Sequence, residues 1–342
     1  VGVMLDGGAD VDTLVGPDAD TGWIVSGVGS GKIADADFSG VEELAGGSED
    51  DNFTIEPEGL ITGTIAGGGG TGFDSMAIAG ETFDLVAYRT LGPDSGTITL
   101  SRSGTTRLIT YAGLELITDS SGGAKTFEGT DDTDAPEIIT VTDSGTAGDN
   151  AFTIQISTGE DVTYTNASAI TSLTINAGEG DDEIVLDALD SLFQGSLTID
   201  AGEGDDRITV NAKSSSGIYT IHGGDDSGED GDTLILTRDA NFALTDTLLA
   251  AGGDSYILAD VEVAQLTGGV SANTFDVSGF TGNTELSGLG GDDIFISGAG
   301  DDAMDGGAGN DTYRFIGTEL GFDSIVEAED SDADTLDFSL FT

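Results

Sequence analysis

Three short segments near the C-terminus combine glycine and aspartate in a spacing that could bind a hard metal cation. They fit the nonapeptide G-G-x-G-x-D-x-U-x, and they read Ser287-Gly-Leu-Gly-Gly-Asp-Asp-Ile-Phe, Ser297-Gly-Ala-Gly-Asp-Asp-Ala-Met-Asp and Gly306-Gly-Ala-Gly-Asn-Asp-Thr-Tyr-Arg, with Ile296 as one extra residue. Glycine permits positive φ and a close approach of backbone carbonyls, and Ca²⁺ takes about six to eight oxygens from carboxylates and carbonyls. The candidate calcium ligands are Asp292, Asp302, Asp311, Gly288, Gly290, Gly298, Gly300, Gly307 and Gly309.

Weaker copies of the same pattern lie upstream, at residues 7–14, 177–185 and 201–209. They add Asp12, Asp182 and Asp206 to the candidate ligands. Asp182 and Asp206 occupy equivalent positions of consecutive repeats, so they could share one ion. The alternative interpretation of these weaker copies is that they form solvated corners of the fold.

A longer repeat predicts the elements that carry these turns. Ser172-Leu-Thr-Ile-Asn-Ala-Gly-Glu-Gly-Asp-Asp-Glu-Ile aligns with Ser196-Leu-Thr-Ile-Asp-Ala-Gly-Glu-Gly-Asp-Asp-Arg-Ile, and a third copy begins at Tyr219. Each unit reads as an alternating strand, a Gly/Asp turn and a second strand, and one unit cannot bury its apolar face alone. The repeats predict an all-β parallel solenoid with minimal helix. Residues 239–251 are the only plausible helix, and alternation there favours a strand equally.

Composition limits the class of protein. The 342 residues include 65 Asp and Glu but only 9 Lys and Arg, a net charge of −56, and 46 of the 65 acids are Asp. A nucleic-acid partner would require a basic footprint, which is absent. There is no Cys and no apolar run of membrane-spanning length. The 37% hydrophobic content suffices for a core, so the acidic excess needs a cation to offset it.

The nonapeptides resemble the repeats-in-toxin (haemolysin-type) calcium-binding family. The resemblance implies a parallel β-roll with Ca²⁺ between turns, one ion being held by motif n and motif n+2. It also implies that Asp292 and Asp311 stack on one edge while Asp302 lies on the other.

A larger module recurs at Phe38-Ser-Gly-Val-Glu-Glu-Leu, Tyr111-Ala-Gly-Leu-Glu-Leu-Ile and Leu258-Ala-Asp-Val-Glu-Val. This module is similar to those of very large secreted bacterial repeat proteins and adhesins.

Repeats and charge divide the chain into four segments. We expect a degenerate solenoid at 1–84, a near-neutral β-hairpin insert and link at 85–137, a solenoid with coils of 22–24 residues at 138–285, and the calcium-binding β-roll with its following segment at 286–342. The insert contains Arg89, Arg102, Arg107 and Lys125. It is interpreted as a surface loop, a protruding hairpin or a strand pair for a neighbour.

These features predict a secreted, extracellular structural segment of an adhesin, matrix fibre or surface layer, exported by type I secretion and folding on Ca²⁺, rather than an enzyme. Copies of itself, as a filament or layer, or a cell-surface or polysaccharide ligand are the open alternatives for a partner. Two other functions remain: a secretion and folding module of a secreted enzyme, and a β-helix carbohydrate-active enzyme. The single histidine, His222, occupies a repeat position, and Arg207 and Lys213 are the other groups considered for catalysis.

Overall fold

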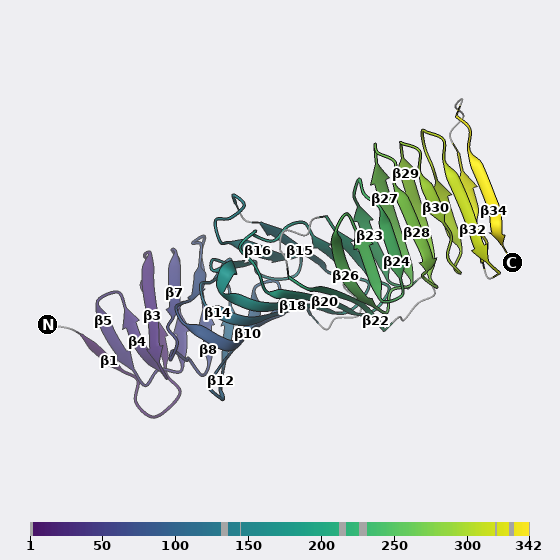
Figure 1. Cartoon of the computed structure of the whole chain (residues 1–342). Coiled ribbons are helices and arrows are strands. Elements are labelled where there is room, and N and C mark those ends of the chain that lie inside the picture. The colour runs from purple at the N-terminus through teal and green to yellow at the C-terminus, as the bar shows by residue number, and fades with distance from the viewer. Residues whose placement is uncertain are drawn as a thin grey trace.

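The computed structural model describes residues 3–130, 136–143, 145–211, 217–225, 231–318, 320–327 and 332–341. The chain forms an elongated solenoid with its termini at opposite ends (Figure 1). The strands of the described residues form two sheets of 17 strands each, which confirms the predicted all-β solenoid. The helical content of the described residues is one short 3₁₀ turn, η1 (Ala167–Ala169), and no described helix is long and apolar enough to span a membrane.

Each coil contributes to both sheets, because single strands or groups of three strands alternate between sheet A and sheet B along the chain. In spatial order, the strands of sheet A are β1 (Met4–Asp6), β5 (Ala36–Ser39), β4 (Ser30–Ile33), β3 (Thr21–Gly27), β7 (Asp51–Ile55), β9 (Ser75–Ile78), β13 (Leu116–Asp119), β17 (Val162–Tyr164), β16 (Phe152–Ile156), β15 (Ile138–Asp143), β19 (Glu183–Leu186), β21 (Arg207–Val210), β23 (Thr233–Thr237), β27 (Val263–Gly269), β29 (Asn283–Leu289), β31 (Asp302–Asp305) and β33 (Ser324–Val326).

Sheet B faces sheet A across the core. In spatial order, its strands are β2 (Thr13–Val15), β6 (Glu43–Ala45), β8 (Thr64–Ala66), β12 (Thr105–Ala112), β11 (Ser95–Arg102), β10 (Thr82–Gly92), β14 (Gly122–Glu128), β18 (Ile170–Glu179), β20 (Ser196–Glu203), β22 (Tyr219–Asp225), β26 (Asp254–Ala259), β25 (Leu248–Ala251), β24 (Phe242–Thr245), β28 (Thr274–Gly279), β30 (Ile294–Ile296), β32 (Thr312–Gly317) and β34 (Thr335–Phe341).

The core forms because alternate residues of each strand point inward. The predicted repeat sets the register, since Leu173 pairs with Leu197 and Leu197 with Tyr219 across β18, β20 and β22, and all three side chains are buried. Similar side chains therefore stack along the solenoid axis. Near the C-terminus the stack is aromatic, with ring centroids 4.8–5.2 Å apart, and comprises Phe242, Phe275, Phe295 and Tyr313.

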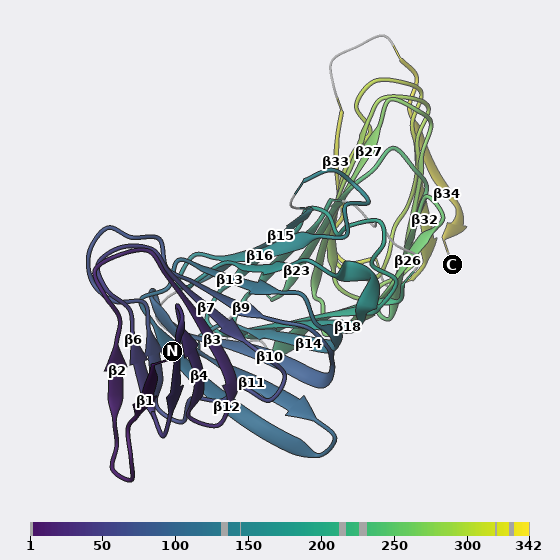
Figure 2. The same ribbon diagram turned by 90° about the vertical axis from the view of Figure 1, so that its left-hand side faces the viewer.

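In the part of the chain that the structure describes, four antiparallel meanders interrupt the parallel winding: β3–β5, β10–β12, β15–β17 and β24–β26. In each, the third strand pairs parallel with the preceding coil and the first strand pairs with the following coil. The meanders alternate between sheets A and B along the chain. Each sheet therefore gains the same number of extra strands, and the two sheets stay paired along their length (Figure 2).

The near-neutral insert contains the expected hairpin, and the hairpin is part of sheet B. Strands β10, β11 and β12 pair with one another and, at their two sides, with β14 and β8. Arg102 forms ion pairs with Glu58 and Glu81, and Arg107 with Glu58, so these cations contact an earlier coil of the same chain. Among the described strands, both sheets run through all four sequence segments. Residues 239–251, where a helix was the alternative, form β24 and β25.

Candidate calcium sites at the solenoid edges

Acidic residues at the start of successive strands form ladders along the edges of the solenoid. The backbone N–H of Asp182, just before β19, donates a 2.7 Å hydrogen bond to Oδ1 of Asp206 in the next coil. Asp206 donates in the same way to Asp232 at 2.8 Å, and Glu137 donates to Asp182 at 2.7 Å. Each carboxylate thus ties its own coil to the backbone of the coil before it.

The C-terminal ladder shows that the first nonapeptide begins one residue later than the sequence predicted. The ladder runs from Asn273 to Asp293 (2.6 Å), from Asp293 to Asp311 (2.7 Å) and from Asp311 to Asp334 (3.0 Å). The expected stacking of Asp292 on Asp311 is therefore wrong, and Asp293 takes that position. With motifs at 288–296, 297–305 and 306–314, Ile296 is the ninth residue of its motif and no residue is extra.

Asp292 instead lies on the outside of the turn. Its side chain is exposed, and Oδ1 accepts hydrogen bonds from the backbone N–H and the side-chain amide of Asn310 at 2.8 and 3.2 Å. These donors lower the pKa of Asp292 below its usual value. The adjacent aspartates of an Asp-Asp pair thus differ in environment, which the motif alone did not indicate.

Asp302 is the first residue of β31 in sheet A and lies on the opposite edge, as the family resemblance implied. Oδ1 accepts a 2.7 Å hydrogen bond from Thr284, and Oδ2 accepts one of 2.8 Å from the backbone N–H of Gly298. Its own N–H donates to Asp323 at 3.2 Å. Burial raises the pKa of Asp302. Nonapeptides therefore alternate between the two edges.

The buried carboxylates fit a calcium ion because they hold oxygens that the protein does not satisfy. Oδ2 of Asp12, Asp182, Asp293 and Asp323 is buried without a hydrogen-bond partner among the described residues. Burial raises the pKa of Asp182 to about 7 and that of Asp293 and Asp323 to about 6. A buried carboxylate oxygen without a partner is costly when charged, and a bound divalent cation would satisfy it and favour the ionised form.

The predicted glycines leave space for these oxygens. A Cβ on Gly288 would lie 2.2 Å from Oδ2 of Asp293, and one on Gly309 would lie 1.9 Å from the carbonyl oxygen of Gly291. Gly309 also has a φ of 136°. Its place between stacked turns therefore excludes any side chain. The remaining candidate glycines are Gly290 and Gly307, beside the turns that carry Asp293 and Asp311, and Gly298 and Gly300, in the turn before Asp302 on the opposite edge.

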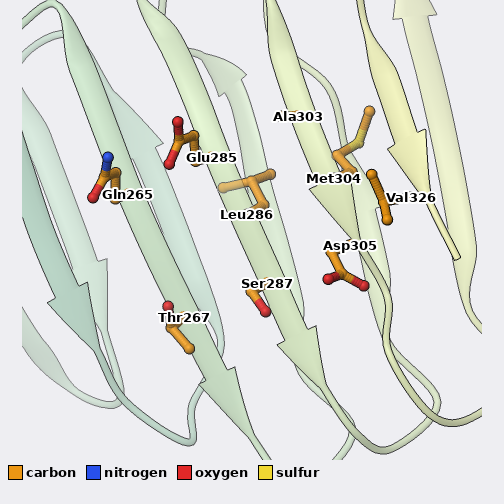
Figure 3. A pocket seen from close by; sticks show the side chains of 9 residues that line it. All are labelled: Gln265, Thr267, Glu285, Leu286, Ser287, Ala303, Met304, Asp305 and Val326. Atoms are coloured by element: carbon orange, nitrogen blue, oxygen red, sulfur yellow. The ribbon is translucent and has the colours of Figure 1, made fainter. Parts of the chain in front are cut away.

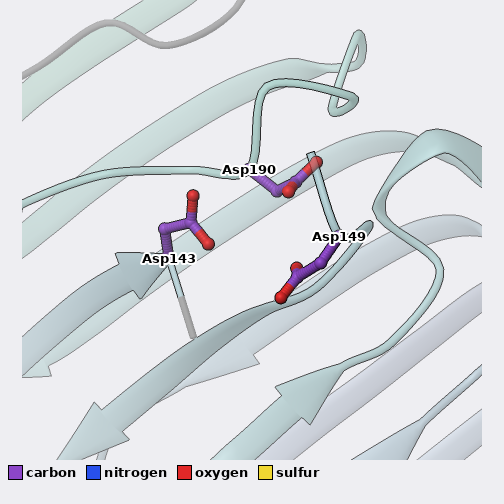
Figure 4. A group of neighbouring side chains, drawn as sticks. All are labelled: Asp143, Asp149 and Asp190. Atoms are coloured by element: carbon purple, nitrogen blue, oxygen red, sulfur yellow. The ribbon is translucent and has the colours of Figure 1, made fainter. Parts of the chain in front are cut away.

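Two acidic groups that sequence reasoning missed gather ligand atoms within 4.8 Å of one another. One contains Asp311, Glu327 and Asp334, and it extends the sheet B ladder by residues from beyond the nonapeptides. The other contains Asp143, the last residue of β15, together with Asp149 and Asp190, which lie in the loops after β15 and β19 (Figure 4). In this second group, Oδ2 of the buried Asp190 accepts hydrogen bonds from the backbone N–H groups of Gly148 and Asn150, so backbone donors hold it.

Sequence reasoning also missed why the larger module contains a glutamate. After three of the meanders, this glutamate accepts a hydrogen bond from the backbone of the preceding ladder aspartate. The three pairs are Asp12 with Glu42 at 3.0 Å, Asp74 with Glu115 at 2.5 Å, and Asp232 with Glu262 at 3.0 Å. The recurring Val-Glu or Leu-Glu step after these three meanders was the available signal.

The groups considered for catalysis are dispersed. His222 pairs in register with Asp200 and lines a groove of about 440 Å³ on the outer face of sheet B, with Glu203 and Asp225 among its other residues. Arg207 donates a 3.1 Å hydrogen bond to Gln265 on sheet A. Lys213 lies outside the described residues.

A second shallow groove, of about 280 Å³, crosses the outer face of sheet A over β27, β29, β31 and β33 (Figure 3). Its polar lining comes from Gln265, Thr267, Glu285, Ser287 and Asp305. These side chains include two carboxylates and no cation, so the groove does not favour an anionic ligand.

Comparison with known families supports the calcium assignment of the C-terminal segment. Residues 278–313 match the family model of the RTX calcium-binding nonapeptide repeat (4 copies). The comparison with curated proteins found no match to the chain. The family resemblance is thus confirmed for this segment, whose repeats bind Ca²⁺, and proteins with such repeats are typically secreted.

A pair of adjacent substitutions tests the revised register. Asp293→Asn retains a side-chain acceptor but removes the charge, and the preceding coil already carries Asn273 at this position. We expect Asp293→Asn to weaken calcium affinity about tenfold or more, because loss of even an outer partner of a metal site costs about 10–100-fold. Asp292→Asn, one residue away and exposed, is the control and should change affinity little. Calcium titrations followed by calorimetry distinguish the two variants. A larger effect of Asp292→Asn would contradict the revised register and support the frame in which Asp292 stacks on Asp311.

Proposed function

We propose that this chain is an extracellular structural segment of an adhesin, matrix fibre or surface-layer protein, which folds on Ca²⁺ after type I secretion. The observation that carries the proposal is the arrangement of carboxylates in ladders along both edges of an elongated solenoid. Asp51 and Asp74 in the first coils and Asp311 and Asp334 in the last follow the same hydrogen-bond pattern. A cation-linked edge of this length suits a load-bearing or spacing element.

Electrostatics explains why such a segment would fold only outside the cell. A net charge of −56 opposes the compact state through self-repulsion. Because Ca²⁺ binds the folded edges and not the extended chain, binding and folding form one equilibrium, and stability increases with free Ca²⁺. Low Ca²⁺ keeps the chain extended for export, and millimolar Ca²⁺ favours the solenoid.

We further propose that the segment is not an enzyme. The histidine lies in repeat register on the outer face of sheet B, and the candidate cation Arg207 lies on sheet A. The described grooves are shallow and on the outer faces. A general acid–base mechanism would instead place such groups within hydrogen-bond reach of one another.

Small-angle scattering and circular dichroism during a calcium titration test the proposal. We expect a calcium-free chain at neutral pH to be expanded with little sheet signal, and excess Ca²⁺ to give a rod with the two-sheet signal. Mg²⁺ at equal concentration is the control, because it prefers near-ideal octahedral geometry and gives up its water reluctantly. A chain that is already a folded rod in chelator, with no gain in melting temperature on adding Ca²⁺, would rule the proposal out.

Contact between copies is the finer part of the proposal. Successive coils pair in parallel, as β18 does in register with β20 and β19 with β21. Head-to-tail stacking of a second copy would continue the same pairing in both sheets. In the same scattering experiment, forward intensity above the monomer value at high protein concentration would support the contact, and a constant monomer mass would contradict it.

A further inference from the structure

A lysine and an aspartate occupy core positions that neighbouring coils fill with apolar or aromatic residues. Lys125 on β14 pairs in register with Val86 and Leu173, and Asp119 on β13 pairs with Ile78 and Tyr164. Both charged side chains are fully buried, and Lys125 Nζ lies 2.6 Å from Oδ2 of Asp119. Replacing such a pair by well-packed apolar residues is often neutral or stabilising, so stability alone does not explain its presence.

The ion pair belongs to a buried hydrogen-bond network that also contains Tyr88 and Ser121. Tyr88 donates a 2.8 Å hydrogen bond to Oδ2 of Asp119. Ser121 donates to Oδ1 from its backbone and its hydroxyl, at 2.7 and 2.6 Å, and its hydroxyl accepts from Lys125 at 2.6 Å. The Tyr164 hydroxyl is buried without a hydrogen-bond partner among the described residues and interacts electrostatically with Asp119.

We propose that Lys125 and Asp119 become joined by an intramolecular amide bond, which ties sheet B to sheet A across the core. The inference does not depend on the proposed calcium function. Because the two residues are only six positions apart in sequence yet lie on opposite sheets, the bond would prevent the sheets from parting at this coil.

The reaction needs no partner from outside the site. One proton passes along the 2.6 Å contact from the ammonium to the carboxylate, which gives a neutral amine and a carboxylic acid. Nζ then attacks Cγ, a Cγ–Nζ bond forms, and one Cγ–O bond breaks. The departing oxygen carries its own proton and one from Nζ, so one water leaves and no oxidant or reductant is required.

The surroundings favour each step. Burial lowers the pKa of Lys125, although Asp119 acts in the opposite direction, and a neutral amine is the nucleophilic form. Tyr88 already contacts a reacting oxygen, and the Tyr164 hydroxyl is a further donor for the oxyanion of the tetrahedral intermediate. Water is excluded from the core, which opposes hydrolysis of the product.

Mass spectrometry of the chain folded in Ca²⁺ tests the bond. We expect an intact mass lower than the sequence mass by one water. Trypsin should then leave residues 108–207 as one peptide, also lighter by one water, because acylated Lys125 is not cleaved. Two peptides, 108–125 and 126–207, at full mass would overturn the proposal and leave a plain buried ion pair, and so would a water loss located elsewhere with cleavage after Lys125.

The chain offers a matched control in Lys32 and Asp37, which form the same type of pair at 2.9 Å but with about half of each side chain exposed. Cleavage after Lys32 should be complete. Asp119→Asn should lose ammonia instead of water and give the same product mass as the wild type, whereas Lys125→Arg should retain its full sequence mass. A Lys125→Arg chain that also lost water would overturn the assignment even if the wild type had lost one.

Discussion

In calcium-free buffer, lowering the pH from about 7.5 to about 5 is expected to shift the chain toward the folded state. Burial raises the pKa of Asp182 to about 7 and of Asp293 and Asp323 to about 6, from an ordinary value of 3.8. At pH values between the ordinary pKa and these raised pKa values, the folded state binds more protons than the unfolded state. Its stability is therefore greatest at low pH and falls as pH rises, by an amount on the order of several kcal/mol for such a set.

Calcium should reverse the sign of this dependence. When Ca²⁺ occupies the edges, protons compete with the ion for the same carboxylates, so acidification releases the ion and destabilises the fold. Thermal melts of metal-free and calcium-saturated protein across this pH range measure both slopes. Metal should be removed by dialysis rather than by EGTA, whose affinity itself depends on pH. Slopes of the same sign in both buffers would show that the buried edge carboxylates are not the calcium ligands.

Asp119→Ala is expected to destabilise the calcium-bound chain by about 3–5 kcal/mol, because it leaves Lys125 buried without its charged partner. Denaturant unfolding in saturating Ca²⁺ measures this change. The predicted loss does not require the amide bond, since removing Asp119 removes either form of the pair. The effect should exceed that of Asp37→Ala, whose partner Lys32 is exposed and whose pair should contribute about 0–1 kcal/mol.

A triple variant separates charge burial from packing. Asp119→Ile and Lys125→Leu introduce the residues found in register at Ile78 and Leu173, and Tyr88→Phe removes the hydroxyl that would lose its acceptor. We expect this variant to unfold within about 2 kcal/mol of the wild type or to be more stable, as is common when buried ion pairs are replaced by apolar residues. A loss as large as that of Asp119→Ala would mean that the pair contributes through a bond or geometry that packing cannot replace.

The repeats predicted the coil and its inward-facing residues because both have a local cause. Alternation in Ser196-Leu-Thr-Ile specifies which side chains point inward, and identical spacing of successive copies specifies the register between strands. The acidic turns were predicted for the same reason, since glycine and aspartate next to a strand are a local signal.

Two features could not be predicted from local signals. They are the meanders and the frame of the first nonapeptide, which begins one residue later than expected. A meander requires its first strand to lie beyond its third, and that order depends on pairing with coils before and after it. Asp292 and Asp293 are chemically identical and adjacent, and only stacking on Asp311 buries one and exposes the other.

The sequence by itself determined a calcium-linked, all-β solenoid, because charge, composition and repeat spacing act through local rules. The tertiary structure decided which oxygens face the edge, which glutamates join the ladders, and that Lys125 meets Asp119 inside the core. These are contacts between separate coils or opposite sheets, and their geometry exists only once the two sheets face each other across the same core.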